Sequence, residues 1–514
     1  MNLLPKVRNM LFSDKKHVTA GFALVILIIS FFTFFVGYER PAALFWDENY
    51  HIPSAEKYIQ GKMFMECHPP LGKLLIAFGE VLLSPNKTID KSALAQTDYT
   101  ASVPGNLSFA GYRFFPVLFA MSGAVFFFLI LFFISKNNIL SFAGSFLYLF
   151  DNALIVHFRG AMLDGIQLFF ILAAIVCFLY SLQTEKKLKW VNYAVMGIFT
   201  GLAISVKLNS AIIIPLFVFL FGYEYRTKLH ELYQHLFIDK SIKKAFGKFF
   251  FLCRKSLIRI AQSVPAVIVV FLLVFFIHTS LGQTLLPGNT YKASPAYKEA
   301  VAKKEPLSLL NFPVMLFDNL YYISTYHEGV PKLDGTNPNE NGSHPFSWPL
   351  GGKTINYRWE KSAGTVKYLY LAGNPVIWTV GLVGLLLGFI LVAGKFIFKT
   401  PITHRKLFFL ISVFLFLYIS YMAAMAGIDR VMYLYHYLIP LQFSTILSFL
   451  IFFYIYRENI KEKNLKVFVS IILICFMIVK TFLFFSPLTY YKGLTTTQFK
   501  AREWSEYWRM KHVE

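Results

Sequence analysis

The sequence has few charged residues for its length. Only 15% of its 514 residues are charged, whereas a soluble chain carries about 25%. This shortage excludes an ordinary soluble globular protein, and the mean hydropathy of +0.53 agrees with that exclusion. Apolar runs of about 20 residues, long enough to cross a bilayer, recur along the whole chain. Because lipid leaves the backbone no water to bond, the composition predicts an all-α polytopic membrane protein.

Cysteine is scarce as well. Two of the four cysteines, Cys177 and Cys475, fall in apolar runs, Cys253 lies in a basic loop, and only Cys67 remains outside. This scatter excludes a disulfide framework. No second ligand stands at a zinc-like spacing, so the sequence predicts no metal site.

Acidic residues are scarcer than basic ones. The chain has 28 Asp and Glu against 50 Lys and Arg, which gives a formal net charge of +22. A basic balance can indicate nucleic acid. Here, however, many of the cations stand in short loops between apolar runs, where membrane topology and anionic lipid explain them. We therefore expect membrane lipid, and no nucleic acid, as a partner.

Eleven spans are predicted. They are roughly 20–37, 111–134, 139–157, 161–182, 190–206, 208–223, 262–281, 374–397, 407–426, 431–455 and 467–486. With the N-terminus inside, the basic loops fall on the cytoplasmic side, as the positive-inside rule requires. Those loops are the ones around 136, 186–189, 404–406 and 457–466, with the longer 224–261 segment.

With this orientation, the long polar segments lie on the outer side of the membrane. The resulting organisation is an N-terminal module over 1–281 that includes the first outer loop, 38–110, a cap over 282–373, C-terminal spans over 374–486, and an outer tail over 487–514. In the first loop, Asp47 to Gln60 is expected to form a helix on the membrane. A second helix should open after Pro69 and Pro70, because proline is tolerated in a first helical turn.

The carboxylate pair Asp47 and Glu48 stands directly outside the first span, with Glu66, His68 and Lys73 further along the loop. A carboxylate at a membrane surface can act as general base toward a hydroxyl. The pair could equally form a solvated acidic turn or cap a helix. The neighbouring HPPLGK segment favours function, because a proline-initiated helix beside His68 and Lys73 could orient a phosphate.

Ionisable residues also interrupt or border later spans. Arg113 begins the second span, Arg159 precedes Asp164 at the outer end of the fourth, and Lys207 separates the fifth from the sixth. Such groups are costly at membrane depth and usually face a cavity, a partner or a ligand. Arg159 and Asp164 could form a structural ion pair. Lys207 has no local acid, so a bound anion is its expected partner.

Aromatic and histidine residues mark the later outer segments. His344 and Trp348 lie in the second outer loop, where they could line a sugar or peptide groove or serve as interfacial anchors. His436 follows Asp429-Arg430 at the same outer end, and alone it would suit a buried bundle histidine. All these groups converge on one membrane face, where a lipid-linked phosphate would place its phosphate.

At these residues the chain resembles the protein O-mannosyltransferase family, the dolichyl- or polyprenyl-phosphate-mannose enzymes of the GT-C fold. The family's acidic pair and HPPLxK motif read here as Trp46-Asp47-Glu48 and Glu66 to Lys73. The similarity continues through Gly111–Arg113, Arg159–Asp164, Gly201–Lys207, Ser347–Leu350 and Tyr435–Pro440. Eukaryotic members carry a β-trefoil MIR insertion in the second outer loop. The 92 residues of 282–373 are too few for it, so the chain looks like a bacterial member.

The resemblance implies an inverting transfer of mannose to Ser or Thr hydroxyls of translocated proteins. Asp47 would be the base, and Glu48 would orient the acceptor or the loop. The implied ligands of the donor phosphate are Arg113, Arg159, Lys207 and Lys73. The implied substrate contacts are Glu66, His68, Asp164, His344, Trp348 and His436.

The resemblance also implies the surroundings of this reaction. The donor would be polyprenyl-phosphate mannose, the acceptor a Ser/Thr-containing protein, and the secretion translocon a candidate partner. The expected location is a bacterial plasma membrane, with the site on the outer face. No resident cofactor is implied, although a divalent cation between Asp47 and the phosphate is left open.

Two other functions fit parts of the sequence. A relative with the same fold could move a sugar from polyprenyl phosphate to a glycolipid such as lipid A, since the HPP-lysine motif is partly shared with such enzymes. A lipid or sugar transporter could use buried Arg, Lys and Asp along its path. Against transport, no repeat relates the two halves, and the polar residues gather on one side.

Overall fold

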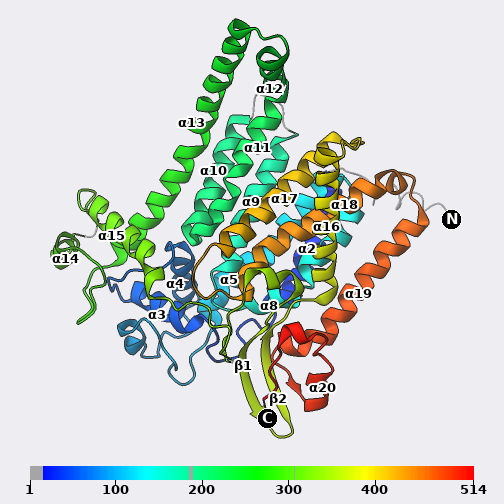
Figure 1. The fold of residues 1–514 in the computed structure, drawn as a ribbon. Coiled ribbons are helices and arrows are strands. Elements are labelled where there is room, and N and C mark those ends of the chain that lie inside the picture. Colours follow the sequence, from blue (N-terminus) through cyan, green and yellow to red (C-terminus); the bar gives the residue numbers. More distant parts are fainter. Residues whose placement is uncertain (1–15, 184–188, 306, 338, 514) are drawn as a thin grey trace.

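The computed structural model describes residues 16–183, 189–305, 307–337 and 339–513, and most of its regular structure is helical (Figure 1). Nine helices of this described part are long and apolar enough to cross a membrane. They are α2 with η1 (Lys16–Phe35), α5 (Ala110–Ser135), α9 (Asp164–Ser181), α10 (Lys189–Val206), α13 (Ile242–Leu281), α16 (Pro375–Ile397), α17 (Arg405–Ala426), η8 with α18 (Leu434–Lys461) and α19 (Leu465–Thr489).

Two further spans are bent pairs of helices. Asn138–Leu149 (α6 and α7) meets α8 (Asn152–Phe158) at 61°, and Leu208–Glu224 (η4 and α11) meets Arg226–Ile238 (α12 and η5) at 72°. The first break follows from Asp151, whose side chain accepts the N–H of Leu154 at 2.9 Å and so starts α8 afresh. With nine to eleven spans in the described residues, the predicted all-α polytopic fold is confirmed.

The elements outside the spans gather at one end of the bundle, the lower end in Figure 1. Both predicted loop helices are confirmed, as α3 (Glu48–Ile59) and α4 (Leu71–Leu83). The second long segment and the chain end supply α14 (Pro295–Ala302), α15 (Phe312–Thr325), η7 (Pro345–Leu350), β1 (Ile355–Ser362), β2 (Thr365–Leu371), β3 (Gly493–Leu494) and α20 (Thr496–Lys500). The strands form one antiparallel sheet in the order β1-β2-β3.

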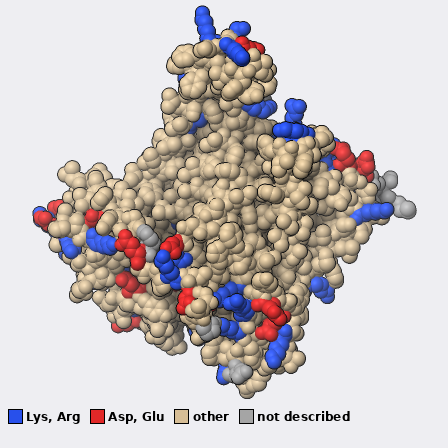
Figure 2. Space-filling model, viewed as in Figure 1, with Lys and Arg blue, Asp and Glu red and all other residues tan. Residues whose placement is uncertain are grey.

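Charge is distributed as a membrane requires. Figure 2 shows Lys, Arg, Asp and Glu gathered toward the ends of the bundle and almost absent from its middle. Helix α13 has 40 residues, about 60 Å of helix, and with α12 it rises beyond the other helices (Figure 1). Lys186 and Lys187 of the predicted basic loops, and residues 1–15 of the predicted N-terminal module, lie outside the described residues.

A close helix crossing places the first loop against the bundle. Helix α4 packs on α5, where an added Cβ on Gly79 would collide with the carbonyl oxygen of Gly111 and lie 3.3 Å from Cδ2 of Phe115. Glycine is therefore required for this approach, because any side chain would push against backbone rather than against a flexible group.

We expect Gly79→Ala to lower the free energy of unfolding by about 1–3 kcal/mol, because the added methyl group separates α4 from α5. Thermal unfolding of the purified protein in detergent measures this loss. Gly21→Ala is the matched control, since nothing lies within 4 Å of a Cβ at Gly21 in α2. An equal midpoint for Gly79→Ala and the unsubstituted protein would contradict the close crossing.

Candidate active site

A buried ion pair between Glu48 and Arg113 holds the start of the first loop. Both side chains are fully buried, and Nε and Nη2 of Arg113 lie 2.7 and 2.9 Å from the two carboxylate oxygens of Glu48. The same carboxylate accepts the backbone N–H groups of Phe45 and Ala161 at 3.2 and 2.9 Å. A buried pair is stable only when its other donors and acceptors are also satisfied, and here they are. These contacts support a role for Glu48 in orienting the loop.

Arg113 has no N–H left for a ligand. Its other N–H groups donate to the backbone carbonyls of Glu39, Pro41 and Ala43 at 2.8, 2.8 and 2.9 Å. The five donors of the guanidinium therefore all meet protein acceptors. This geometry contradicts the prediction that Arg113 binds a donor phosphate, because the phosphate would have to displace buried carbonyls.

Arg159 is also turned away from the predicted phosphate. Its guanidinium lies 4.9 Å from the ring centre of Tyr490 and donates to backbone carbonyls at the end of the first span. The acceptors are the carbonyl oxygens of Phe34, Val36 and Gly37. The structure therefore gives Arg159 a place at the end of η1, and the expected contact with the donor phosphate is not supported.

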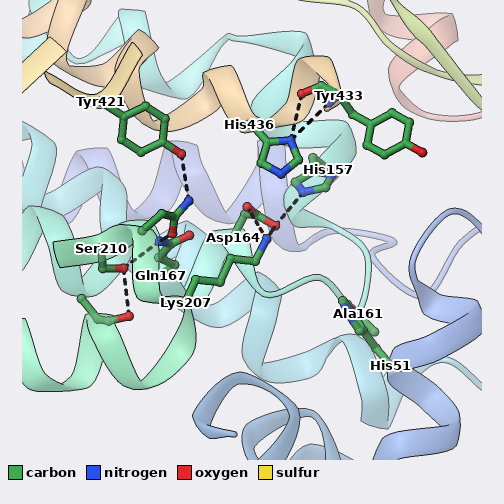
Figure 3. A network of polar contacts seen from close by, with 12 residues as sticks. His51, His157, Ala161, Asp164, Gln167, Lys207, Ser210, Tyr421, Tyr433 and His436 are labelled. Carbon is green, nitrogen blue, oxygen red and sulfur yellow. Dashed lines mark hydrogen bonds and ion pairs between the residues drawn. The ribbon is translucent and has the colours of Figure 1, made fainter. Parts of the chain in front are cut away.

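Asp164 is the centre of a buried polar cluster (Figure 3). Lys207 Nζ lies 2.9 Å from both of its carboxylate oxygens, and His157 Nε2 lies 3.0 Å from Oδ2. Two expectations are thus wrong: Lys207 has a protein acid as its partner rather than only a bound anion, and Asp164 pairs with Lys207 rather than with Arg159. A buried lysine needs such a partner because its charge is costly without one.

Strand β1 completes this cluster from the second long segment. The β1–β2 register shifts between Asn356 and Arg358, so Tyr357 occupies a bulge. Such irregularities re-aim a side chain, and the Tyr357 hydroxyl lies 2.8 Å from His157 Nδ1. Because the Asp164 carboxylate can only accept, His157 donates through Nε2 and accepts the Tyr357 hydroxyl through Nδ1.

A column of rings joins the same cluster to the C-terminal spans. Trp348 stacks on His436, His436 on Tyr435, and Tyr435 on His157, with centroids 6.1, 4.3 and 4.8 Å apart. Trp348 is fully buried and donates to Ser343 Oγ at 2.9 Å. The sequence allowed Trp348 to line an open sugar or peptide groove. Trp348 is instead buried, with its ring stacked on that of His436.

A cavity of about 230 Å³ opens beside Lys207. Its lining includes polar side chains from the first loop, from the start of η4, from the segment before η8 and from η8 itself. They are His68, Lys207, Asn209, Arg430 and His436. Arg430 has no hydrogen bond or ion pair with another described residue. Its neighbour Asp429 pairs with Lys332 instead. Since Asp164 already balances Lys207, Arg430 leaves this cavity with an uncompensated positive charge.

Asp47 is the free carboxylate of this region. It occupies the N-cap position of α3 and is half-buried, and its carboxylate makes no hydrogen bond or ion pair within the described part of the chain. Burial raises the pKa of Asp47 above its ordinary value, while Lys207 and His157 oppose that rise. Asp47 thus lies within the electrostatic field of the Asp164 cluster and still has both oxygens available to a ligand.

The remaining predicted residues fall into two groups. Lys73 forms a buried ion pair with Glu66, and neither side chain lines the cavity. His68 lines the cavity, and burial together with Lys207 holds its pKa well below the usual range, so His68 is neutral at pH 7. His344 is exposed and lines an adjoining cavity of about 320 Å³ that shares Arg430. In the described part of the chain, no group of three His, Cys, Asp or Glu side chains is arranged to hold a metal ion.

Two family models match this chain. The model described as "Dolichyl-phosphate-mannose-protein mannosyltransferase" matches residues 24–281, and "C-terminal four TMM region of protein-O-mannosyltransferase" matches residues 326–508. The chain belongs to the protein O-mannosyltransferase family. The first match contains Asp47, Asp164 and Lys207, and the second contains Tyr357 and Arg430, so the site is built from both family regions.

Curated relatives within this family share short stretches of the chain. Dolichyl-phosphate-mannose--protein mannosyltransferase 1 of Candida albicans is 28% identical over 227 residues, 44% of this chain and 25% of that protein. Protein O-mannosyl-transferase 2 of Danio rerio is 25% identical over 169 residues, 32% of this chain and 21% of that protein. The matched stretches therefore span about a quarter of the length of these two curated relatives.

Solved structures show that the fold is shared more widely. The S. cerevisiae protein O-mannosyltransferase Pmt1-Pmt2 complex bound to the sugar donor aligns with a TM-score of 0.72 at 14% identity, over 98% of this chain and 94% of that chain. The oligosaccharyltransferase AglB from Archaeoglobus fulgidus aligns with a TM-score of 0.50 at 11% identity, over 95% of this chain and 58% of that chain. These likenesses establish the GT-C fold.

We expect Glu48→Gln to lower the free energy of unfolding by about 3–5 kcal/mol, because it leaves the buried Arg113 without its countercharge. Asp47→Asn, one residue away and without a partner, should change the unfolding midpoint little. Both can be measured by thermal unfolding in detergent. A stable Glu48→Gln variant would show that the pair does not hold the loop.

Proposed function

We propose that this chain transfers mannose from a polyprenyl-phosphate-mannose donor to Ser or Thr hydroxyls of proteins, with inversion at the sugar. The observation that carries the proposal concerns Asp47, a carboxylate with no partner among the described residues. It lies in the electrostatic field of Lys207, which lines a cavity whose surplus charge is positive. Family membership supplies the sugar and the two substrate classes, and the cavity supplies a place for a phosphate.

The chemistry needs one base and one stabilised leaving group. Asp47 takes the proton of the acceptor hydroxyl as its oxygen forms a bond to C1 of mannose. The bond between C1 and the phosphate oxygen breaks on the opposite face, and polyprenyl phosphate leaves with its bonding electrons. Inversion follows because a single displacement occurs, without the second carboxylate nucleophile that a retaining reaction uses.

The leaving phosphate gains negative charge as the bond breaks, so fixed cations lower the barrier. Arg430 suits this role because its planar guanidinium can bind two phosphate oxygens and has no acidic partner among the described residues. Lys207 contributes less, since Asp164 accepts from it through both oxygens. We therefore assign Arg430 as the principal phosphate ligand and Lys207, with His68, as its support.

The setting proposed for the reaction is the outer face of a bacterial plasma membrane. The short basic loops at the far end of the bundle support this orientation. Acceptors would then be proteins leaving the cell, with the secretion translocon as candidate partner. No resident cofactor is part of the proposal. A divalent cation between Asp47 and the phosphate is the alternative, and it would make the activity sensitive to a chelator.

We expect Asp47→Asn to lower kcat by roughly 10²–10⁴-fold while donor binding is retained, because the base is lost and the cavity is not. The assay uses purified protein, labelled polyprenyl-phosphate mannose and a Ser/Thr peptide. Because burial raises the pKa of Asp47, activity should fall with decreasing pH at a midpoint above the ordinary aspartate value near 4.

Asp90→Asn is the control, because Asp90 is an exposed aspartate in the same loop. This variant should keep the unsubstituted kcat and the same fall of activity with decreasing pH. If Asp47→Asn turned over normally, a different base would be required. If altered glycolipid, rather than altered Ser/Thr hexosylation, followed deletion of the gene, the acceptor class would be wrong.

We expect Arg430→Gln to reduce kcat/KM by about 10- to 100-fold, because a charge-assisted contact to the phosphate is worth roughly 1.5–3 kcal/mol. Lys361→Gln is the control, because Lys361 is exposed in β1 and lines neither of the two cavities that contain Arg430. Equal kinetics for the two variants would contradict the assignment of the phosphate to Arg430.

A further inference from the structure

A second polar cavity lies at the opposite end of the bundle. It has a volume of about 790 Å³. Leu407 and Leu410 of α17 line it, whereas Met425 of the same helix lines the active-site cavity. From Leu407 to Met425 the helix rises by about 27 Å, close to the roughly 30 Å thickness of a bilayer core. The second cavity therefore lies at the other membrane surface.

Cationic side chains from three elements converge on this cavity. Its described lining has six permanent cations and no carboxylate, and the cations come from the end of α5, the start of α17 and the end of α18. They are Lys136, Arg405, Lys406, Arg457, Lys461 and Lys463. One of the six, Lys461, pairs with Glu458, which does not line the cavity. The mutual repulsion of the cations favours an anion in the cavity, and such convergence exceeds what a single basic loop supplies.

Two of these cations have no side-chain partner among the described residues. The side chains of Arg405 and Lys406 make no hydrogen bond or ion pair in that part of the chain. They stand in the first turn of α17, where His404 gives no side-chain cap to the backbone N–H groups. His404 instead contacts Nη1 of Arg457 through Nδ1 at 2.8 Å. Guanidinium, ammonium and uncapped helix N–H groups therefore border the same space, a combination suited to phosphate.

The floor of the cavity is apolar. Phe133, Ile134, Leu410 and Phe453 line it below the cations, and they belong to the membrane-spanning helices α5, α17 and α18. A soluble phosphate would leave this apolar surface in contact with water. A phospholipid would place its headgroup among the cations and the top of its acyl chains against the floor.

We propose that this cavity binds the headgroup of an anionic phospholipid at the membrane surface opposite the active site. Basic pockets between membrane helices recognise such headgroups, and each cation near an anionic surface contributes about 1 kcal/mol. The bound lipid would join the end of α5, in the first family region, to α17 and α18 in the second. The described lining residues form no ion pair between these two regions.

Native mass spectrometry of the purified full chain, titrated with phosphatidylglycerol or phosphatidylcholine, tests this proposal. The unsubstituted protein should bind phosphatidylglycerol more tightly. The double variant Arg405→Gln with Lys406→Gln should bind it roughly 30-fold more weakly, because two unpartnered charges are removed. Neither substitution removes a hydrogen bond or ion pair within the described chain, so the fold should be retained.

The double variant Arg254→Gln with Lys255→Gln is the control, because it removes two charges from α13, outside the cavity. It should bind phosphatidylglycerol as the unsubstituted protein does. Equal binding of the two lipids, or unchanged binding by the Arg405 and Lys406 variant, would overturn the proposal. Displacement of phosphatidylglycerol by millimolar inorganic phosphate would also overturn it, since the ligand would then be a soluble phosphate.

Discussion

The carboxylate of Asp164 is the interaction on which the site depends. It stands at the start of α9 and accepts from Lys207, at the end of α10, and from His157, at the end of α8. Through His157 it also reaches Tyr357 of β1 and, by ring stacking, the residues before α18. Three spans and the second long segment therefore meet at one buried charge. Without that charge Lys207 would be buried and unpaired, which is costly at membrane depth.

This arrangement divides the ionisable groups into those that are satisfied and those that are available. Glu48 and Arg113 satisfy each other, as do Asp164 and Lys207. Asp47 and Arg430 have no such partner among the described residues. Arg430 lines the cavity together with Lys207, and the carboxylate of Asp47 lies in the electrostatic field of Lys207. A reaction that moves a proton to a carboxylate and leaves charge on a phosphate needs such a pair. The satisfied groups hold the loop and the spans so that the available ones stay in place.

Local patterns in the sequence predicted the spans and both loop helices. Apolar length marked the helices, and Pro69 and Pro70 marked the start of α4. The partners of charged residues could not be predicted in this way, because they depend on tertiary contacts. Glu48 meets a residue 65 positions away, and Lys207 meets one 43 positions away. The sequence placed Asp429-Arg430 at the outer end but gave Arg430 no role, because whether its charge is available depends on the pairing of Asp429 with Lys332.

The most direct test of this account is a cryo-EM structure of the Asp47→Asn variant with polyprenyl-phosphate mannose and an acceptor peptide. The account predicts the phosphate within hydrogen-bond distance of Arg430 and near Lys207, the side chain at position 47 facing C1 from the opposite side, and Glu48 still bound to Arg113. A phosphate held by Arg113 or Arg159, with Arg430 directed elsewhere, would contradict it.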